Sequence, residues 1–208
     1  LGDLSCSTDQ IAKWDGSAWV CEPLSNYYTR SEVDALLADM DSRVAALETK
    51  LASVTVSGDD LYFTEVNVHI RDGSGNTEGA VNGLGNLIIG YNEDIGGDAT
   101  RTGSHNLVVG KNHSYSSYAG FVAGLSNTIS GPYASVSGGD YNTASGTASS
   151  VTAGYGNEAV GWYSTVAGGK FNTASGYFSS VLGGGGPPTS AGNEAWSDFS
   201  VVVGGQDN

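Results

Sequence analysis

The residues that could support acid–base or metal chemistry are few and scattered. The histidines, His69, His105 and His113, stand far apart and form no metal-spaced pair. Each is typical of a surface or turn histidine, although a fold that added other donors would make it a metal ligand. His113 stands near a repeated asparagine position, so three copies around a threefold axis would be able to share an anion or a metal ion. No Ser-His-Asp set, phosphate-binding loop or dinucleotide fingerprint is present, so the sequence predicts neither catalysis nor a cofactor.

Two acidic clusters are the other candidates for ion binding. One contains Glu93, Asp94 and Asp98, and the other is Asp59-Asp60. Carboxylates are the ligands that Ca²⁺ prefers, but the calcium-binding nonapeptide of β-roll proteins is absent. Hydrated acidic loops are the commoner meaning of such clusters, so no metal site is predicted.

Cys6 and Cys21 frame a unit with the pattern of a β-hairpin. Gln10–Trp14 and Ser17–Val20 alternate as strands do, and Asp15-Gly16 between them predicts a two-residue turn. Cysteines at the ends of such a hairpin are placed to form a disulfide, which implies an oxidising compartment. Two free thiols are the alternative, and a zinc site lacks its other ligands.

A repeat organises the C-terminal half of the chain. Gly139, Gly154 and Gly169 fall at steps of 15, and each stands three residues before an asparagine. The units read N-x-A-x-G-x-x-S-x-V, and the last, from Asn193, arrives six residues late because a loop near 183–192 is inserted. Self-similarity at a short fixed period is typical of a solenoid.

Within each unit, small or apolar residues alternate, which predicts two strands of about five residues and two turns. The inward-facing residues would be only Asn, Ala, Ser and Val. This core is small for the conformational entropy that folding must offset. We therefore expect neighbouring chains to cover part of the solenoid.

Aromatic residues recur at one position of the repeat, in the two residues that follow the glycine (or Ser197) of a unit. The pairs are Pro132-Tyr133, Trp162-Tyr163, Tyr177-Phe178 and Asp198-Phe199. Because units stack, these pairs are expected to form a ladder along one edge. The ladder would either pack between rungs or chains, or form an exposed platform for sugars. The candidate ligand surface adds the inserted loop and a nearby tryptophan; its residues are Trp162, Tyr163, Tyr177, Phe178, Pro187, Pro188, Trp196 and Phe199.

Residues 29–54 have the pattern of a coiled coil. Thr29 to Glu32 forms a capping box, and Arg43 and Glu48 are spaced for an ion pair between chains. The apolar spacing alternates between four and three residues, which indicates a coiled coil, and Leu at a with β-branched residues and Leu at d favours an assembly other than a dimer. An amphipathic helix on a globular core is the alternative. The predicted seam contains Val33, Leu37, Met40, Val44, Leu47, Leu51 and Val54.

Composition excludes two classes of partner. The 8 basic and 22 acidic residues give a net charge of −14 with no basic stripe, so nucleic acid is not expected. No apolar run is long enough for membrane insertion.

The chain begins at Leu1 without a methionine, and we expect it to be part of a longer protein.

The repeat N-x-A-x-G-x-x-S-x-V-x-G-G resembles the YadA-like head of trimeric autotransporter adhesins. "YYTRSEVDALLADM" resembles the coil that precedes phage tail-fibre modules, and the cysteine hairpin resembles stalk modules of large bacterial surface proteins. The resemblance implies a mosaic trimeric fibre whose head is a left-handed parallel β-roll of three intertwined chains. In this chain the coil precedes the head, whereas in the standard adhesin the head is N-terminal to the stalk.

The sequence as a whole predicts a mostly β protein in four parts. These are a disulfide hairpin (1–28), a parallel trimeric coiled coil (29–54), an adaptor (55–83) with a strand at Thr64–Ile70, and a β-roll head (84–208). The expected function is non-catalytic attachment of a homotrimer, at the bacterial cell surface or outside the cell, to a glycan or envelope component of another cell. A phage or tailocin tail-fibre domain, a purely structural shaft and a β-helical acyltransferase are the alternatives.

Overall fold

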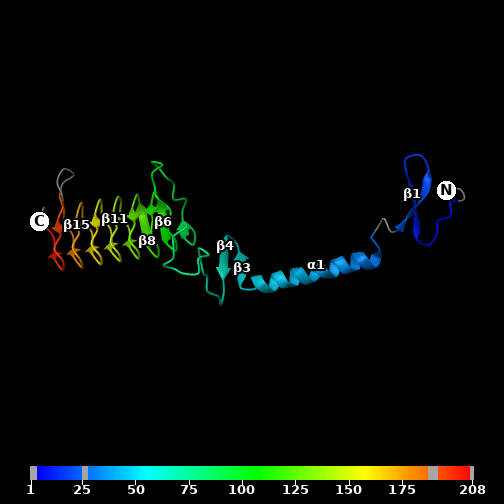
Figure 1. Cartoon of the computed structure of the whole chain (residues 1–208), viewed down its shortest axis with the longest axis horizontal. Coiled ribbons are helices and arrows are strands. Elements are labelled where there is room, and N and C mark those ends of the chain that lie inside the picture. Colours follow the sequence, from blue (N-terminus) through cyan, green and yellow to red (C-terminus); the bar gives the residue numbers. More distant parts are fainter. Residues whose placement is uncertain (1–3, 25–27, 187–191, 207–208) are drawn as a thin grey trace. The chain divides into compact units, whose positions relative to one another are not determined.

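The computed structural model describes residues 4–24, 28–186 and 192–206. The chain divides into two compact units at Val68, and Figure 1 traces the elements of each. No helix in these described ranges is long and apolar enough to cross a membrane.

The first unit begins with the predicted hairpin. Strands β1 (Gln10–Trp14) and β2 (Trp19–Pro23) pair antiparallel, and a disulfide joins Cys6 to Cys21, as predicted. The prediction of a two-residue turn is wrong, because four residues connect the strands. The Asp15 carboxylate accepts hydrogen bonds from the N–H groups of Ser17 (2.8 Å) and Ala18 (2.9 Å), which stabilises the longer loop.

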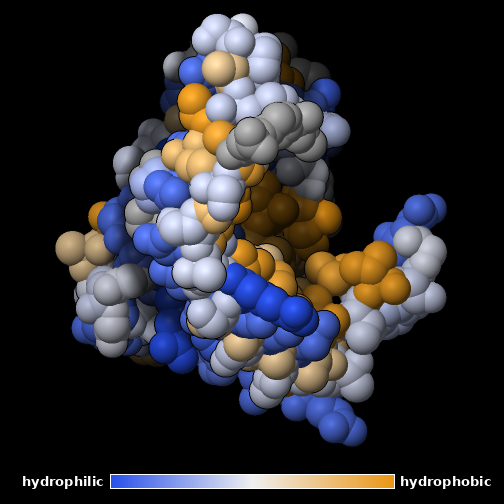
Figure 2. All heavy atoms as spheres, turned by 90° about the vertical axis from the view of Figure 1, so that its right-hand side faces the viewer, coloured by the Kyte–Doolittle hydropathy of each residue, from blue (hydrophilic) through white to orange (hydrophobic). Residues whose placement is uncertain are grey.

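Helix α1 (Arg30–Leu51) follows, with Thr29 as its N-cap. The capping box is present: the Glu32 N–H donates to Oγ1 of Thr29, and the Thr29 N–H donates to the Glu32 carboxylate. No residue of α1 is buried in the single chain, and its apolar side chains are between 41% and 58% exposed. The space-filling view in Figure 2 shows hydrophobic side chains lying open at the surface.

The helix is shorter than predicted, because Val54 belongs to a second hairpin. Strand β3 (Val54–Ser57) pairs antiparallel with β4 (Asp60–Phe63), and Val54 lies opposite Phe63. The β-branched run Val54–Val56 favours a strand over continued helix. The predicted strand at Thr64–Ile70 is also wrong: this segment pairs with no strand, and Glu65 has a left-handed backbone (φ 60°).

The second unit is a parallel β-solenoid with two sheets. The larger sheet contains β5 (Leu87–Ile89), β6 (Leu107–Lys111), β8 (Phe121–Leu125), β10 (Ser135–Val136), β12 (Ser150–Val151), β14 (Thr165–Val166), β16 (Ser180–Val181) and β18 (Val201–Val202). The smaller sheet contains β7 (Ser114–Tyr115), β9 (Thr128–Ile129), β11 (Thr143–Ala144), β13 (Glu158–Ala159), β15 (Thr173–Ala174) and β17 (Glu194–Ala195). From β6 onward the chain alternates between the two sheets, whereas β5 and β6 follow one another in the larger sheet.

The strand register confirms the repeat. Ser135 pairs with Ser150, which pairs with Thr165, in steps of 15 residues. The final step, from Ser180 to Val201, spans 21 residues and absorbs the inserted loop.

The strands are shorter than the predicted five residues, because most contain only two. Each regular coil holds three residues with positive φ, for example Gly154, Gly156 and Tyr163. A left-handed residue turns the chain out of an extended conformation, so three per coil leave little room for strand.

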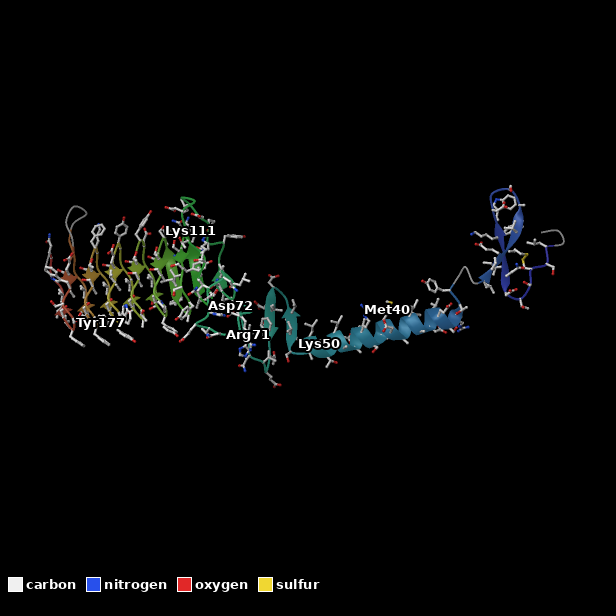
Figure 3. The ribbon with its side chains drawn as sticks, in the orientation of Figure 1. Met40, Lys50, Arg71, Asp72, Lys111 and Tyr177 are labelled. Carbon is white, nitrogen blue, oxygen red and sulfur yellow. A yellow bond between two sulfur atoms is a disulfide. The ribbon has the colours of Figure 1, made fainter. Side chains whose placement is uncertain are left out.

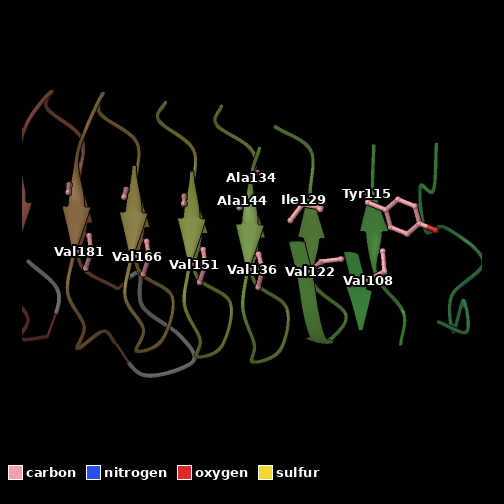
Figure 4. Packing of buried hydrophobic residues seen from close by; sticks show 13 residues of the cluster. Val108, Tyr115, Val122, Ile129, Ala134, Val136, Ala144, Val151, Val166 and Val181 are labelled. Carbon is pink, nitrogen blue, oxygen red and sulfur yellow. The ribbon is translucent and has the colours of Figure 1, made fainter. Parts of the chain in front are cut away.

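The core contains the inward-facing residues that the pattern predicts. One column of valines, from Val108 to Val181, lines the larger sheet and one of alanines, from Ala144 to Ala195, lines the smaller sheet, and these side chains are 0–1% exposed. Figure 4 shows Val136, Val151, Val166 and Val181 stacked in successive coils. Asn142, Asn157 and the serines of the motif complete this narrow interior.

Candidate binding surfaces

The aromatic pairs form the expected ladder along one edge of the solenoid. The rings of Tyr163 and Phe178 stack at 4.8 Å between centroids, and those of Phe178 and Phe199 at 5.4 Å. Trp162 and Tyr177 form a parallel row, with 5.3 Å between their centroids. These five side chains stay 42–73% exposed in the single chain, and Figure 3 shows Tyr177 projecting away from the coils. The edge therefore presents a continuous, partly apolar surface.

The second aromatic residue of each pair has an unusual backbone conformation. Tyr163, Phe178 and Phe199 have φ values of 59°, 53° and 59°. This conformation costs an L-residue free energy, which the surrounding structure must offset. The ladder is interrupted at Ala148, which takes the equivalent place one coil before Tyr163.

Tyr133, the earliest aromatic residue at this position, belongs to a separate cluster. Its ring contacts Tyr118 edge-on at 5.4 Å, and its hydroxyl donates to the Glu78 carboxylate. That hydrogen bond to Glu78 raises the pKa of Tyr133 to about 12. Tyr133 thus anchors residues near Glu78 to the solenoid.

Two other members of the predicted ligand surface do not join the ladder. Trp196 directly follows β17 and is 77% exposed on the outer side of the smaller sheet, in line with Ser175 and Val160 of the preceding coils. Pro187 and Pro188 lie outside the described residues. The structure therefore brings together Trp162, Tyr163, Tyr177, Phe178 and Phe199.

A second aromatic row, which the sequence reasoning missed, lies at the other turn of each coil. Tyr155 contacts Tyr141 at 5.8 Å and Phe171 at 5.5 Å between centroids, both edge-on. The Lys170 ammonium lies 5.3 Å from the centroid of Tyr155 and 5.1 Å from that of Phe171, within cation–π range. The signal was available, because Asp140-Tyr141 and Lys170-Phe171 occupy the same place before the repeat asparagine.

A column of buried asparagines connects the coils below this row. The N–H of Asn157 donates to Oδ1 of Asn142, and the N–H of Asn172 donates to Oδ1 of Asn157, each at 3.0 Å. Each side-chain amide also donates to backbone carbonyls; that of Asn157 reaches Ala153 (3.2 Å) and Gly169 (3.0 Å). The asparagine of the motif is thus a structural residue that satisfies the turn backbone.

His113 occupies an asparagine position in this column and is fully buried. Its Nδ1 accepts a hydrogen bond from the Asn127 N–H (3.2 Å), and its Nε2 lies 3.1 Å from the Val109 carbonyl oxygen. These partners require a neutral ring with the proton on Nε2. Burial lowers the pKa of His113 below its usual 6.5, and Arg101 lowers it further. His113, expected near a repeated asparagine position, stands at one, and both of its ring nitrogens face protein partners. The shared ion at a threefold axis stays a prediction.

His105 lies beside Asp72 and Ser74, an arrangement that the sequence did not indicate. Ser74 Oγ donates to the Asp72 carboxylate at 2.7 Å, and the Asp72 N–H donates to Nε2 of His105 at 3.3 Å. The hydrogen bonds from Ser74 lower the pKa of Asp72, with a smaller effect from His105. Because Ser74 points to Asp72 rather than to His105, the histidine is not placed to activate the hydroxyl.

The acidic clusters have structural roles where contacts are described. Asp94 accepts a hydrogen bond from the Gly97 N–H (2.8 Å), which closes a turn. Among residues 4–24, 28–186 and 192–206, no group of three or more His, Cys, Asp or Glu side chains is arranged to hold a metal ion. His69 is exposed.

Comparison of the chain with protein-family models, with curated proteins and with solved structures gives no match.

Proposed function

We propose that this chain is the head and neck of a homotrimeric, non-catalytic fibre that attaches to a glycan or envelope component of another cell. The observation that carries this proposal is the ladder of stacked, half-exposed rings from Trp162 to Phe199. Exposed aromatic surface that continues over several coils is unusual unless a partner covers it. Sugars suit such a surface, because their apolar C–H patches pack against exposed aromatic carbon, which here comes from the edges of the stacked rings and from the tilted rings of Trp162 and Tyr177.

The neck supports a trimer. Val33, Leu37, Met40, Val44, Leu47 and Leu51 alternate in steps of four and three along α1, and all are exposed in the single chain. An isolated helix of 22 residues with this exposed seam gains stability by packing against copies of itself. Arg43 lies 3.7 Å from Asp39 within its own helix, and the proposed trimer would allow it to reach Glu48 of a neighbouring chain.

The outer face of the larger sheet supports the same assembly in the head. The residues on either side of the column that runs from Ile88 through the buried valines to Val202 point outward from this sheet, and none of them is charged. Lys111, at the end of β6, is a charged residue of the sheet beyond this set. By contrast, Glu158 and Glu194 lie on the outer face of the smaller sheet. In a chain of net charge −14, an uncharged face is the one that like chains can share without repulsion. The uncharged set is Leu87, Ile89, Leu107, Val109, Phe121, Ala123, Ser135, Ser137, Ser150, Thr152, Thr165, Ala167, Ser180, Leu182, Val201 and Val203.

The remaining parts of the proposal follow from the resemblance and from the disulfide. The resemblance adds that the head is a left-handed β-roll of three intertwined chains. The Cys6–Cys21 disulfide favours an extracellular or cell-surface location, because cytosolic reductants keep most thiols reduced.

The test is binding of the whole chain to bacterial and host cells and to a glycan array. A triple variant, Trp162→Ala, Tyr163→Ala and Tyr177→Ala, removes three of the five ladder rings without touching the asparagine column. We expect it to lose most of the binding while keeping its circular dichroism spectrum. Binding that is unchanged in this variant would favour a structural shaft and overturn the role of the ladder.

A further inference from the structure

A groove of about 360 Å³ opens on the edge of the solenoid that carries the second aromatic row. One wall is the loop 92–99, which contributes Asp98, and the rest of the lining comes from successive coils. The strands contribute Ser114 of β7 and Thr128 of β9, and the coil turns contribute Asn112, Ser126 and Tyr141. Lys111, beside Asn112, lies on the opposite side of the solenoid from Tyr177 in Figure 3. The groove and the ladder are therefore separate surfaces.

The loop that forms the wall is held in place by hydrogen bonds. The Ile95 N–H donates to Oδ1 of Asn112 at 2.9 Å, and the Asn112 N–H donates to the Glu93 carbonyl at 2.9 Å. At the end of the loop, the Thr100 N–H donates to Oγ of Ser114 at 3.1 Å. These contacts attach both ends of the loop to the coils, so the hollow exists before any ligand arrives, and a preformed site binds at lower entropic cost.

The lining combines hydroxyls, a carboxylate and an aromatic ring. Ser126 and Thr128 can donate or accept hydrogen bonds, Asp98 can accept two, and Tyr141 is 58% exposed. A volume above ~300 Å³ with convergent polar groups is typical of small-ligand sites. A sugar ring matches this set, because it presents hydroxyls around its rim and C–H groups on its faces.

We propose that this groove binds one residue of an uncharged saccharide, with Asp98, Ser126 and Thr128 bonding its hydroxyls and Tyr141 packing against a ring face. Tyr155 lies next to Tyr141, and its exposed ring continues the surface for the following sugar residue. Acidic sugars are disfavoured, because Glu93, Asp94 and Asp98 all belong to the loop that forms the wall. The proposal goes beyond attachment through the ladder, and either can fail without the other.

The test is saturation-transfer difference NMR on the whole chain with methyl glycosides of glucose, galactose, mannose and N-acetylglucosamine, and with glucuronic acid as the anionic comparison. We expect transfer to at least one neutral glycoside and none to glucuronic acid. Thr128→Val keeps the shape of the strand and removes the hydroxyl. Its matched control is Thr143→Val, because Thr143 pairs with Thr128 in register but lies outside the groove lining.

Thr128→Val and Tyr141→Ala should each weaken binding at least ~5-fold, the loss expected for one hydrogen bond or one ring contact. Thr143→Val and Tyr163→Ala, the latter on the ladder edge, should leave it within twofold. No transfer to any neutral glycoside overturns the proposal. Binding that is lost in Tyr163→Ala but kept in Tyr141→Ala also overturns it, while supporting the proposed function of the ladder.

Discussion

The imidazole of His113 takes the place of an asparagine side chain: its Nδ1 accepts the N–H of Asn127 at 3.2 Å, just as Oδ1 of Asn127 accepts the N–H of Asn142 at 2.7 Å. Its Nε2 faces the carbonyl of Val109, four residues earlier, as the amide of Asn127 faces that of Ala123. The hydrogen-bonded column therefore passes through a group that can titrate.

This substitution predicts that acid destabilises the solenoid. Burial lowers the folded-state pKa of His113 below 6.5, so the unfolded chain takes up a proton before the folded chain does. The contribution of neutral His113 to the free energy of unfolding is therefore fully present above pH 6.5 and is lost as the pH falls below it. Protonation would also place an Nδ1–H against the N–H of Asn127. Thermal unfolding between pH 8 and 5 should show this fall, and His113→Asn should flatten it.

His69→Asn is the control for that experiment, because His69 is exposed. Its pH profile should follow that of the unaltered chain. If His113→Asn loses stability with acid as steeply as the unaltered chain does, other groups cause the effect.

Asn157→Ala should be among the most destabilising single substitutions in the solenoid. It removes the acceptor of the Asn172 N–H and the donor to Ala153 and Gly169, all within a region where Asn157 is fully buried. We expect a loss of ~3 kcal/mol in the free energy of unfolding, at the upper end for an orphaned buried group. Urea denaturation measures it, and Ser175→Ala, on the exposed outer side of the smaller sheet, should change stability by less than ~0.5 kcal/mol.

The repeat predicted the solenoid well because its signal is redundant. Each of Val136, Val151 and Val166 stands at the same step and each is buried, so one frame accounts for register and core together. The six-residue delay before Asn193 likewise predicted the 21-residue step between β16 and β18.

The local turns were predicted less well, because they depend on backbone conformation. Alternation alone predicted longer strands, whereas left-handed residues such as Tyr163 and Phe178 shorten them. An aromatic residue gives no sequence signal for positive φ, unlike glycine. The groove was not foreseen, because it requires the folding of loop 92–99 onto Asn112, an interaction that no spacing in the sequence reveals.

Phe178 tests whether the ladder stabilises a strained turn. Phe178→Ala and Phe178→Gly lose the same ring stacks with Tyr163 and Phe199, but only glycine relieves the left-handed backbone at φ 53°. The glycine variant should therefore be the more stable by ~1 kcal/mol in urea denaturation. At Tyr177, where φ is not positive, the order should reverse. The same order at both positions would mean that strain at Phe178 is negligible.

Reduction of the disulfide should affect the first hairpin alone. Cys6–Cys21 closes a short loop in the first compact unit, and such a crosslink is worth ~3 kcal/mol. Dithiothreitol, or Cys6→Ser with Cys21→Ser, should weaken the near-ultraviolet signal of the contacting rings Trp14 and Trp19. The main thermal transition, from the solenoid, should stay in place. A lowered main transition would show that the hairpin stabilises the solenoid.

The assembly state is tested by one substitution in the seam of α1. Light scattering should give three times the 21.2 kDa chain mass for the unaltered protein. Leu47→Glu would bring three carboxylates together in an apolar seam, and desolvation and like-charge repulsion should disrupt the neck. Ser42→Glu adds the same charge to the opposite face of the helix and should leave the mass unchanged. A monomeric unaltered chain would refute the trimer, whereas a trimeric Leu47→Glu variant would assign the assembly to the uncharged face of the larger sheet, since α1 would then be dispensable.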